Sequence, residues 1–471
     1  MLKNRNRVDT FRSLPRTAVE PVELSAEAQS SPDERNSSRR TPRPTTLERT
    51  PAMRLCFLTN HYPPHSQGSY DRQCWQIAGE LARRNHQIDI LTSKPPPGIH
   101  PGGTEPRVFR VLDLYPESDD PSPSFKRLYG FVSSTRKIFA KHLANSPPDA
   151  IMMWGMDRLP ATLLQQAEAS GIPCLLAVYN HWLANLRQRD PWIRFWEEED
   201  TDTPTVRGIL RGLRLDRYVT NRAAPGFPDT LALRNVYFCS ASLRAETEKS
   251  SGLTLCGASI IPCGISPIDR PRKHDRNSSE FRLVYHARLT PDKDPMTALR
   301  ALRELRHRHG DRFTLDIYGR GSLDYETTLH DFVRRYKLGG SVLFKTLYGP
   351  PAWEALGIYD ALVFTSRHPE PFPLIHLHAM AAEIPVISTL CGASAELIRN
   401  GDNGLVFDAG NHHQLAERIL EIADNPDLAS RLTGTARQEV YRNYGMGTVA
   451  TQIETSLLRM ISEVRSGGKA V

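Results

Sequence analysis

SRHPEPFPLIHLHAMAAEIPVI, residues 366–387, is the stretch around which the chain is organised. It follows an apolar strand expected at Ala361–Ser366. It contains a proline-rich turn with Glu370, a short apolar helix expected to begin after Phe372, and a buried strand at Pro385–Ile387. In a parallel sheet, such a turn sets free backbone N–H groups and a carboxylate at the mouth of the sheet. We therefore expect a phosphorylated sugar to bind here.

The composition is that of a globular protein with two or three domains. The chain has 471 residues, of which 39% are hydrophobic, enough to bury a core. A net charge of +7 favours anionic partners such as phosphates and nucleotides, although part of it lies in the amino-terminal tail. Seven cysteines without C-x-x-C spacing indicate a reduced, cytoplasmic protein without a zinc ribbon.

Membrane contact is expected to be peripheral at most, at the inner membrane surface. The sequence has no apolar run long enough to span a bilayer, and its first residues lack the apolar core of a secretory signal. Residues 1–52 are basic and polar, and we expect a disordered, solvated tail. A basic amphipathic helix at Phe125–Ala144 could lie on an anionic membrane, but the simpler interpretation packs one side of it on the core.

A first domain is expected at residues 53–262. MRLCFLT, residues 53–59, has the content of a buried strand, and a helix at Tyr70–Arg84 and a strand at Gln87–Thr92 complete a Rossmann-like βαβ unit. Gly68 stands where a backbone can approach a ligand closely. Further strands are expected at residues 107–112, 150–154, 174–179, 235–240 and 259–264.

A second domain is expected at residues 281–445, after a polar linker at 263–280 that contains Pro and Arg. Its strands include Phe313–Tyr318 and Val342–Lys345, and its helices include Pro295–His307 and Tyr325–Tyr336. Residues 446–471 are expected to form a helix that crosses back onto the first domain, and then a tail. Two βαβ lobes joined by a linker imply a cleft between them.

Eight motifs, in order, resemble those of the nucleotide-sugar-dependent glycosyltransferases of family 4. They are YPPHSQGS, VYNHWL, SASLRAETE, IIPCGIS, ARLTPDKD, YGRGS, EPFPLIHLHAMAAEIPVI and NGDNGLVFD. The resemblance implies the GT-B fold, an α/β architecture of two Rossmann-like lobes whose parallel sheets face a central cleft. It also implies a hexosyltransferase-type enzyme of polysaccharide or glycoconjugate biosynthesis.

The resemblance further implies the substrates. The second lobe would bind a UDP- or GDP-sugar, and the first would hold a glycan, lipid-linked or small-molecule acceptor, with retention at the anomeric carbon. No metal, other cofactor or nucleic acid is expected. In ARLTPDKD, Arg288 and Lys293 would bind the diphosphate as fixed cations that stabilise the charge developing on it. Glu370, beside Phe372, would contact the sugar hydroxyls.

Backbone groups complete the donor site that the resemblance implies. The N–H groups near Leu374 and Ile375 would face the distal phosphate, with Pro373 expected at the first helical position, where a missing N–H costs little. Gly68 would let the backbone close on the donor. Gly319, in the GRGS segment, resembles the family's glycine loop, although a glycine motif alone means only a tight turn.

Two residues depart from the family's pattern in the organising stretch. His378 stands where the second glutamate of the signature should fall, and an imidazole has one acceptor nitrogen where that carboxylate accepts from both ribose hydroxyls. Glu383 occupies a position where the family usually has Gly, and it cannot replace the lost carboxylate because it points to another side of the helix. We expect weaker donor binding or a different hold on the ribose.

The acceptor side is expected after the strand CLLAVY. Asn180 stands where the family commonly has Asp, and His181 is the titratable side chain beside it, facing either the reaction centre or the sheet. The following DPWIRFW segment is either a lid or a helix that packs its tryptophans. Asp200–Asp202 has the spacing of a metal site of the other glycosyltransferase fold, but a solvated acidic loop is the favoured interpretation.

Two other function classes are carried as alternatives. A degenerate glycosyltransferase that serves as a binding or partner subunit is favoured by His378, Asn180 and Glu383. A nicotinamide-dependent oxidoreductase is disfavoured, because MRLCFLT is not followed by the compact G-x-G-x-x-G that cradles a pyrophosphate.

Overall fold

The computed structural model describes residues 51–66, 68–96, 107–116, 124–197, 204–215, 233–253, 255–267, 280–345 and 356–466. The expected tail over most of residues 1–52, most of the expected linker at 263–280 and the Asp200–Asp202 motif lie outside these residues. The folded part belongs to one compact unit, Ala52–Val471. Within the described residues, no helix is both long and apolar enough to cross a lipid bilayer.

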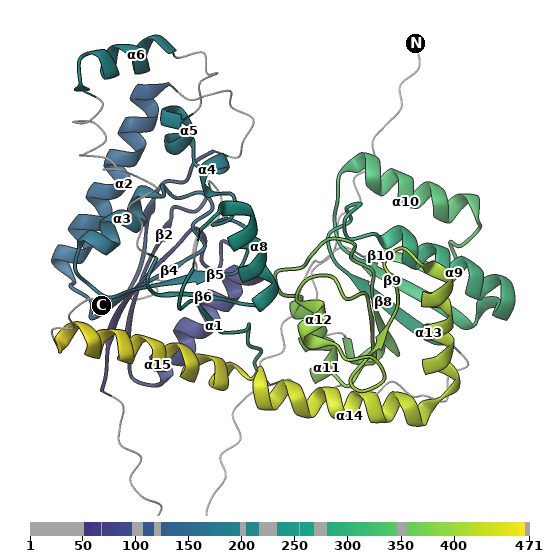
Figure 1. The fold of residues 1–471 in the computed structure, drawn as a ribbon. Coiled ribbons are helices and arrows are strands. Elements are labelled where there is room, and N and C mark those ends of the chain that lie inside the picture. Colours follow the sequence, from purple (N-terminus) through teal and green to yellow (C-terminus); the bar gives the residue numbers. More distant parts are fainter. Residues whose placement is uncertain are drawn as a thin grey trace, which may run out of the picture. The chain divides into compact units, whose positions relative to one another are not determined.

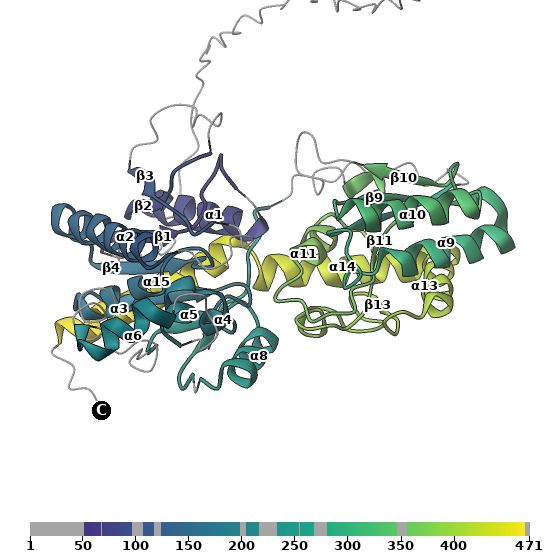
Figure 2. The same ribbon diagram turned by 90° about the horizontal axis from the view of Figure 1, so that it is seen from above.

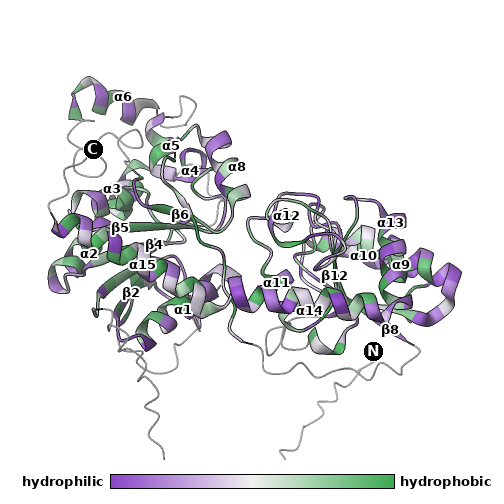
Figure 3. Ribbon diagram, turned by 60° about the horizontal axis from the view of Figure 1, so that its bottom comes forward, coloured by the Kyte–Doolittle hydropathy of each residue, from purple (hydrophilic) through white to green (hydrophobic). Residues whose placement is uncertain are grey.

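The first lobe is built on a parallel sheet whose strand order is β3-β2-β1-β4-β5-β6-β7. The central strands are apolar along their whole length because helices cover both faces of the sheet. Figure 3 shows β4, β5 and β6 coloured hydrophobic accordingly. The strands are β1 (Arg54–Thr59), β2 (Gln87–Ser93), β3 (Val108–Leu112), β4 (Ala150–Trp154), β5 (Cys174–Val178), β6 (Val236–Phe238) and β7 (Ser259–Ile260).

Helices of the first lobe decide two alternatives that the sequence left open. The basic helix α2 (Phe125–Asn145) buries Leu128, Val132 and Phe139 in the lobe, as the simpler interpretation holds. In the DPWIRFW segment, α5 (Pro191–Glu197) buries Trp192, so the segment packs its aromatic side chains rather than presenting them. The other helices are α1 (Ser69–Arg83), α3 (Thr162–Ala169), α4 (Leu186–Arg189), α6 (Pro204–Gly212) and α8 (Ala241–Ser251).

The second lobe repeats the plan with a parallel sheet of order β10-β9-β8-β11-β12-β13 (Figure 1). Its strands are β8 (Phe281–His286), β9 (Phe313–Tyr318), β10 (Val342–Lys345), β11 (Ala361–Phe364), β12 (Val386–Ser388) and β13 (Leu405–Val406). Its helices are α9 (Pro295–His309), α10 (Leu323–Arg335), α11 (Leu374–Ala381), α12 (Ser394–Leu397), α13 (His412–Asp424) and α14 (Pro426–Asn443). The expected α/β class with two parallel sheets is confirmed.

The last helix, α15 (Met446–Arg465), packs on the first lobe against α1 (Figure 2). Arg84, which ends α1, donates to the Gly447 carbonyl at 2.7 Å and to the Glu454 carboxylate at 2.7 Å. The buried His86 ring lies 2.9 Å from the other oxygen of Glu454. Burial alone would raise the pKa of Glu454, but the hydrogen bonds from Arg84 and His86 lower it. These contacts tie the end of the chain to its beginning.

Candidate functional site

A cavity of about 670 Å³ lies where carboxyl ends of strands from both sheets meet. The second lobe lines it with the loops that follow β8 and β11 and with the start of α11. The first lobe lines it with the start of α1 and with the segment after β5. Carboxyl ends of parallel strands are where open α/β sheets bind their ligands. The cavity is therefore the candidate site.

Lys293 and Glu370 form an ion pair on the second-lobe wall of the cavity. Their side chains are only 11% and 12% exposed. The Ser366 hydroxyl donates to the same Glu370 oxygen at 2.7 Å, and the Asp292 carboxylate lies 3.7 Å from the lysine nitrogen. Lys293 and Glu370 are 77 residues apart in the chain, and the structure brings them into contact as the sequence predicted.

The turn that holds Glu370 is fixed by a close approach of backbone. The Glu370 carbonyl accepts from the Ala393 N–H at 2.9 Å. Gly392, the residue before Ala393, has a φ of +63°. A Cβ atom at Gly392 would come within 2.3 Å of the Glu370 nitrogen, so only glycine fits. The first lobe also holds this turn, since the Ser240 hydroxyl donates to the Pro371 carbonyl at 2.7 Å.

Arg288 is exposed and lines the cavity. Among the described residues, none forms a hydrogen bond or ion pair with its guanidinium. The GRG turn after β9 supports its loop, because the Leu289 N–H donates to the Arg320 carbonyl at 2.8 Å. A Cβ atom at Gly319 would lie 2.0 Å from the Ala287 carbonyl oxygen. Gly319 does not line the cavity, and it lets the turn pack under the Arg288 loop; its expected contact with the donor stays a prediction.

The start of α11 also differs from expectation. Pro373 precedes the helix as its N-cap, with ψ of 84°, rather than taking the first helical position. This bend lets the Leu374 N–H donate to the Phe372 carbonyl at 3.0 Å, so the Leu374 N–H is not free. The Ile375 N–H has no hydrogen-bond partner in the described part of the chain, and it remains the candidate donor for an anion. Phe372, Leu374 and Ile375 all line the cavity.

His378 lines the cavity one helical turn further along α11. Burial lowers its pKa to about 3, and His286 and Arg72 add to this effect. Its imidazole is therefore neutral near pH 7. Glu383 lies beyond the helix in the left-handed region, with φ of +57°, which explains why glycine suits this position. Its carboxylate pairs with Arg437 at 2.9 Å and does not line the cavity, as the sequence predicted.

Asn180 and His181 form part of the first-lobe wall. The Asn180 amide donates to the Asp157 carboxylate at 3.0 Å and accepts from the Trp182 N–H at 3.0 Å, so both of its ends hold the loop. His181 faces the cavity and not the sheet, with its Nδ1 atom 3.7 Å from the Glu246 carboxylate and its ring 6.3 Å from the ring of His368. Burial lowers the pKa of His181, while Glu246 acts to raise it.

Gly68 does not line the cavity, contrary to expectation. It caps α1 in an extended conformation, with φ of −162°, and its N–H donates to the Asp71 carboxylate at 3.2 Å. A Cβ atom there would meet nothing within 4 Å. The neighbouring Ser69 and Tyr70 line the cavity instead. The sequence therefore predicted the right segment of the chain, but Gly68 itself caps α1 and lies outside the cavity lining.

Several lining residues were not predicted from the sequence. Arg72 and Gln73 reach the cavity from α1, and His286 and His368 reach it from the ends of β8 and β11. The histidines lie within two or three residues of predicted site residues, so strand ends were a usable signal for them. The α1 residues carried no such signal, because a helical face toward a ligand resembles any solvated face.

Comparison with known proteins finds similarity to sugar-transferring enzymes. Residues 268–439 match the family described as glycosyl transferases group 1. The glycogen synthase of Mycobacterium tuberculosis is 31% identical over 215 residues, which are 45% of this chain and 51% of that protein. The chain thus spans about half the length of this curated relative.

Solved structures share the fold at lower identity. The sucrose-phosphate synthase of Thermosynechococcus elongatus has a TM-score of 0.63 at 17% identity, covering 87% of this chain and 99% of that one. Anabaena HepE in complex with UDP and glucose has a TM-score of 0.58 at 16% identity, covering 86% and 100% of the two chains. These likenesses show that the two lobes have the GT-B fold.

Proposed function

The second lobe belongs to the group 1 glycosyl transferases, and from this premise we propose that the whole chain is an enzyme that transfers a sugar from a nucleotide-sugar donor to an acceptor. The observation that carries the proposal is the meeting of Arg288, Lys293 and Glu370 on one wall of a cavity whose other wall presents His181. Two cations and a carboxylate match the diphosphate and hydroxyl groups of such a donor.

Arg288 is the proposed anchor of the departing diphosphate. Its guanidinium is unengaged among the described residues, so it needs to break no protein contact when an anion arrives. Breaking the sugar–phosphate bond places negative charge on the diphosphate, and a cation held in advance stabilises that charge more in the transition state than before it. The N–H of Ile375 adds a neutral donor on the same side of the cavity.

Lys293 and Glu370 are proposed to act as a pair. In the absence of donor the lysine is held by Glu370, which keeps its charge at the cavity wall instead of in solvent. A diphosphate would compete with Glu370 for this lysine. The Glu370 carboxylate would then be able to accept hydrogen bonds from the sugar hydroxyls. Asp292 and Glu370 are the only carboxylates among the described residues that line the cavity.

Retention at the anomeric carbon follows most simply from this inventory. Asp292 lies 3.7 Å from the Lys293 nitrogen, on the side proposed for the diphosphate. Glu370, which Ser366 also holds, is proposed to contact the sugar hydroxyls, so neither carboxylate is assigned as a nucleophile. We therefore propose attack from the same face as the leaving group. The departing phosphate would take the acceptor proton, and His181 would position the acceptor hydroxyl.

The donor is proposed to be a UDP- or GDP-sugar. The structure of Anabaena HepE contains UDP, which supports a uridine donor for a chain of this fold. In this chain His378, His286 and Arg72 stand near one end of the cavity without a carboxylate. We propose that the ribose is held more weakly there, and that a glycan, lipid-linked or small-molecule acceptor enters beside His181. All seven cysteines are free thiols, in keeping with a cytoplasmic enzyme.

The test is a screen of labelled nucleotide sugars with the wild-type chain and Arg288→Ala. We expect transfer from one donor by the wild type, its loss in Arg288→Ala, and wild-type turnover in Arg442→Ala, which removes an exposed arginine from α14. Unchanged turnover in Arg288→Ala would contradict the proposed role of Arg288 in sugar transfer.

A degenerate binding subunit is the second candidate. It is favoured by the absence of a carboxylate at His378 and by the structural use of both ends of the Asn180 amide. Calorimetry distinguishes the two functions. Donor binding together with turnover establishes the enzyme, whereas the absence of any nucleotide-sugar binding supports the subunit.

A further inference from the structure

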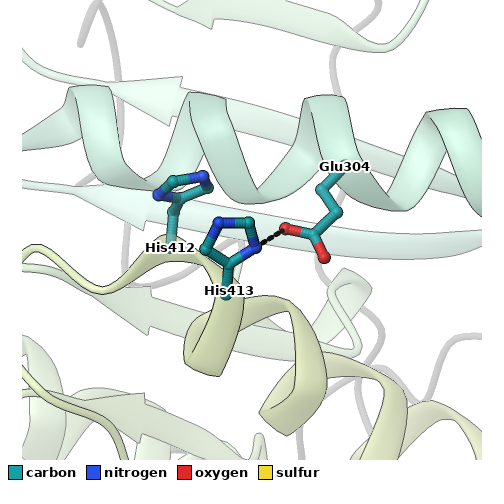
Figure 4. Close-up of side chains that lie close together, drawn as sticks. All are labelled: Glu304, His412 and His413. Carbon is teal, nitrogen blue, oxygen red and sulfur yellow. Dashed lines mark ion pairs between the residues drawn. The ribbon is translucent and has the colours of Figure 1, made fainter.

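Three side chains with metal-binding atoms converge outside the cavity, on the second lobe. They are Glu304 from α9 and His412 and His413 from the first turn of α13 (Figure 4). One ligand atom of each lies within 4.8 Å of those of the other two. The closest pair is His413 Nδ1 and Glu304 Oε2, at 2.7 Å. None of the three lines the cavity, so the proposed sugar transfer does not account for them.

The packing of the two helices sets this arrangement. α9 and α13 share one buried cluster, in which Leu302 and Leu305 of α9 lie with Leu415 and Ile419 of α13. Figure 4 shows Glu304 on α9 pointing its carboxylate to the His413 ring, with the His412 ring next to His413. The helices are therefore held in place by their core, and the polar side chains meet at its edge.

The two histidine rings are arranged toward the same side. Their centroids are 4.1 Å apart and their planes are inclined by 35°. Asn411 caps α13 through the Gln414 N–H at 3.1 Å, which fixes the backbone from which both rings project. Neighbouring histidines on a helix ordinarily diverge by about a quarter turn, so this convergence is a specific feature of the first turn.

Two imidazoles and one carboxylate form a ligand set suited to zinc. Zinc takes nitrogen and carboxylate oxygen at about 2.0–2.2 Å and is often held by three protein ligands and one water. In a tetrahedron with such bonds, neighbouring ligand atoms are about 3.3 Å apart. The Glu304–His413 pair must open slightly and His412 must approach, which are movements within the range of side-chain torsions. Calcium and magnesium prefer all-oxygen sites.

The surrounding charges allow such a site and limit its affinity. Burial lowers the pKa of His412, as do His413, Arg300 and Arg303, while Glu304 acts to raise it. The Arg303 guanidinium stacks on the ring of Tyr336 at 4.1 Å, and Arg308 lies 3.5 Å from the Glu304 oxygen that does not face His413.

We propose that Glu304, His412 and His413 bind one zinc ion, which joins α9 to the start of α13. Without the metal, His413 and Glu304 form an ion pair, and a bound zinc ion takes the place of the proton in that pair. The role is structural, because the ion bridges two helices of one lobe away from the cavity. It is independent of the sugar-transfer proposal, and so is its test.

The test is calorimetric titration of zinc chloride into chelator-treated, tag-free full-length protein. We expect one site per chain. Because even loss of a ligand's hydrogen-bond partner costs about 10–100-fold in metal affinity, Glu304→Gln, His412→Ala and His413→Ala should each weaken binding at least about tenfold. His307→Ala, on an exposed position of α9, is the matched control and should bind as the wild type does. Equal affinity in the three ligand variants would overturn the site.

Three further measurements separate a built site from adventitious binding. Zinc should raise the melting temperature of the wild type and of His307→Ala but not that of the ligand variants, whose folding is checked by circular dichroism without zinc. Arg300→Ala should bind zinc more tightly, because it removes a repelling charge from the site. Binding should weaken from pH 7.5 to 5.5 as protons compete for the imidazoles. An unchanged melting temperature with zinc in the wild type would refute the structural role.

Discussion

Replacing Glu370 by Gln keeps the size of the side chain but removes the charge that pairs with Lys293. The Ser366 hydroxyl can still donate to the amide oxygen, so the turn keeps its 2.7 Å contact. What is lost is the ion pair between two side chains that are 12% and 11% exposed. The variant therefore isolates the charge from the shape of the site.

The magnitude follows from burial and from the neighbouring carboxylate. Breaking a fully buried ion pair costs about 3–5 kcal/mol because one charge is left uncompensated. Here Asp292 lies 3.7 Å from the lysine nitrogen and offers a second partner, and neither Lys293 nor Glu370 is fully buried. We therefore expect a loss of about 1–3 kcal/mol in the free energy of unfolding. A domain of this size loses about 2–4 °C in Tm for each kcal/mol.

The catalytic effect should be separable from the loss of stability. A hydrogen bond to a charged group contributes about 1.5–3 kcal/mol, so losing it between Glu370 and the donor sugar should lower kcat/KM about 10–100-fold. The assay is transfer from the donor identified in the screen, at a temperature where both proteins are folded. Lys293→Met and the double variant complete a double-mutant cycle.

The cycle also defines the result that refutes the reasoning. If the two residues act as a pair, the double variant should be no less stable than either single variant, because it leaves no unpaired charge. Additive losses in unfolding free energy would show that Lys293 and Glu370 do not interact. A Glu370→Gln variant with the Tm and kcat/KM of the wild type would refute both the pairing and the proposed role.

Four other substitutions test separate parts of the structure. His378→Glu should restore a carboxylate beside Arg72 and tighten binding of the donor nucleotide roughly tenfold in calorimetry; unchanged affinity would show that this end of the cavity does not hold the ribose. Gly319→Ala should lower the Tm and raise the KM for the donor, because its Cβ would lie 2.0 Å from a carbonyl oxygen, whereas Gly68→Ala, with open space around it, should change the Tm by less than a degree or two; equal effects would contradict the packing argument. Burial raises the pKa of Asp190 to about 6 from 3.8, so the native state binds this proton more tightly than the unfolded chain does, and the stability contributed by the protonated carboxyl is lost as the pH rises from about 4 to about 6. Denaturant unfolding of Asp190→Asn should give a free energy of unfolding without this decline across that pH range. If the free energies of the wild type and the variant fall in parallel with pH, Asp190 is not the cause of the decline.

The order of strands and helices could be predicted because each element carries its own local signal. Runs such as MRLCFLT and FTLDIY are mostly apolar, as is typical of strands covered on both faces, and β1 and β9 lie within one residue of the predicted bounds. The association of Arg288, Lys293 and Glu370 was also predictable, because all three follow strands of one parallel sheet and their carboxyl ends share an edge.

Atomic roles inside the site depended on contacts that no local pattern carries. Gly319 and Gly68 are both glycines beside predicted strands or helices, yet one is pressed against a carbonyl and the other faces open space. The Leu374 N–H was expected to be free, but the bend at Pro373 directs it to the Phe372 carbonyl. Such differences arise from backbone torsions of a few residues, which composition and spacing do not determine.

The sequence by itself thus determined the two-lobed α/β architecture, the grouping of Arg288 and Lys293 with Glu370, and the presence of a histidine rather than a carboxylate at position 378. Only the tertiary structure decided that His181 faces the cavity, that Arg72 reaches His378 from the other lobe, and that Glu304 meets His412 and His413 between α9 and α13. The physical reason is range. Strand and helix patterns are set by neighbours a few residues apart, whereas these groups are brought together by the packing of elements that lie about 100 to 300 residues apart in the chain.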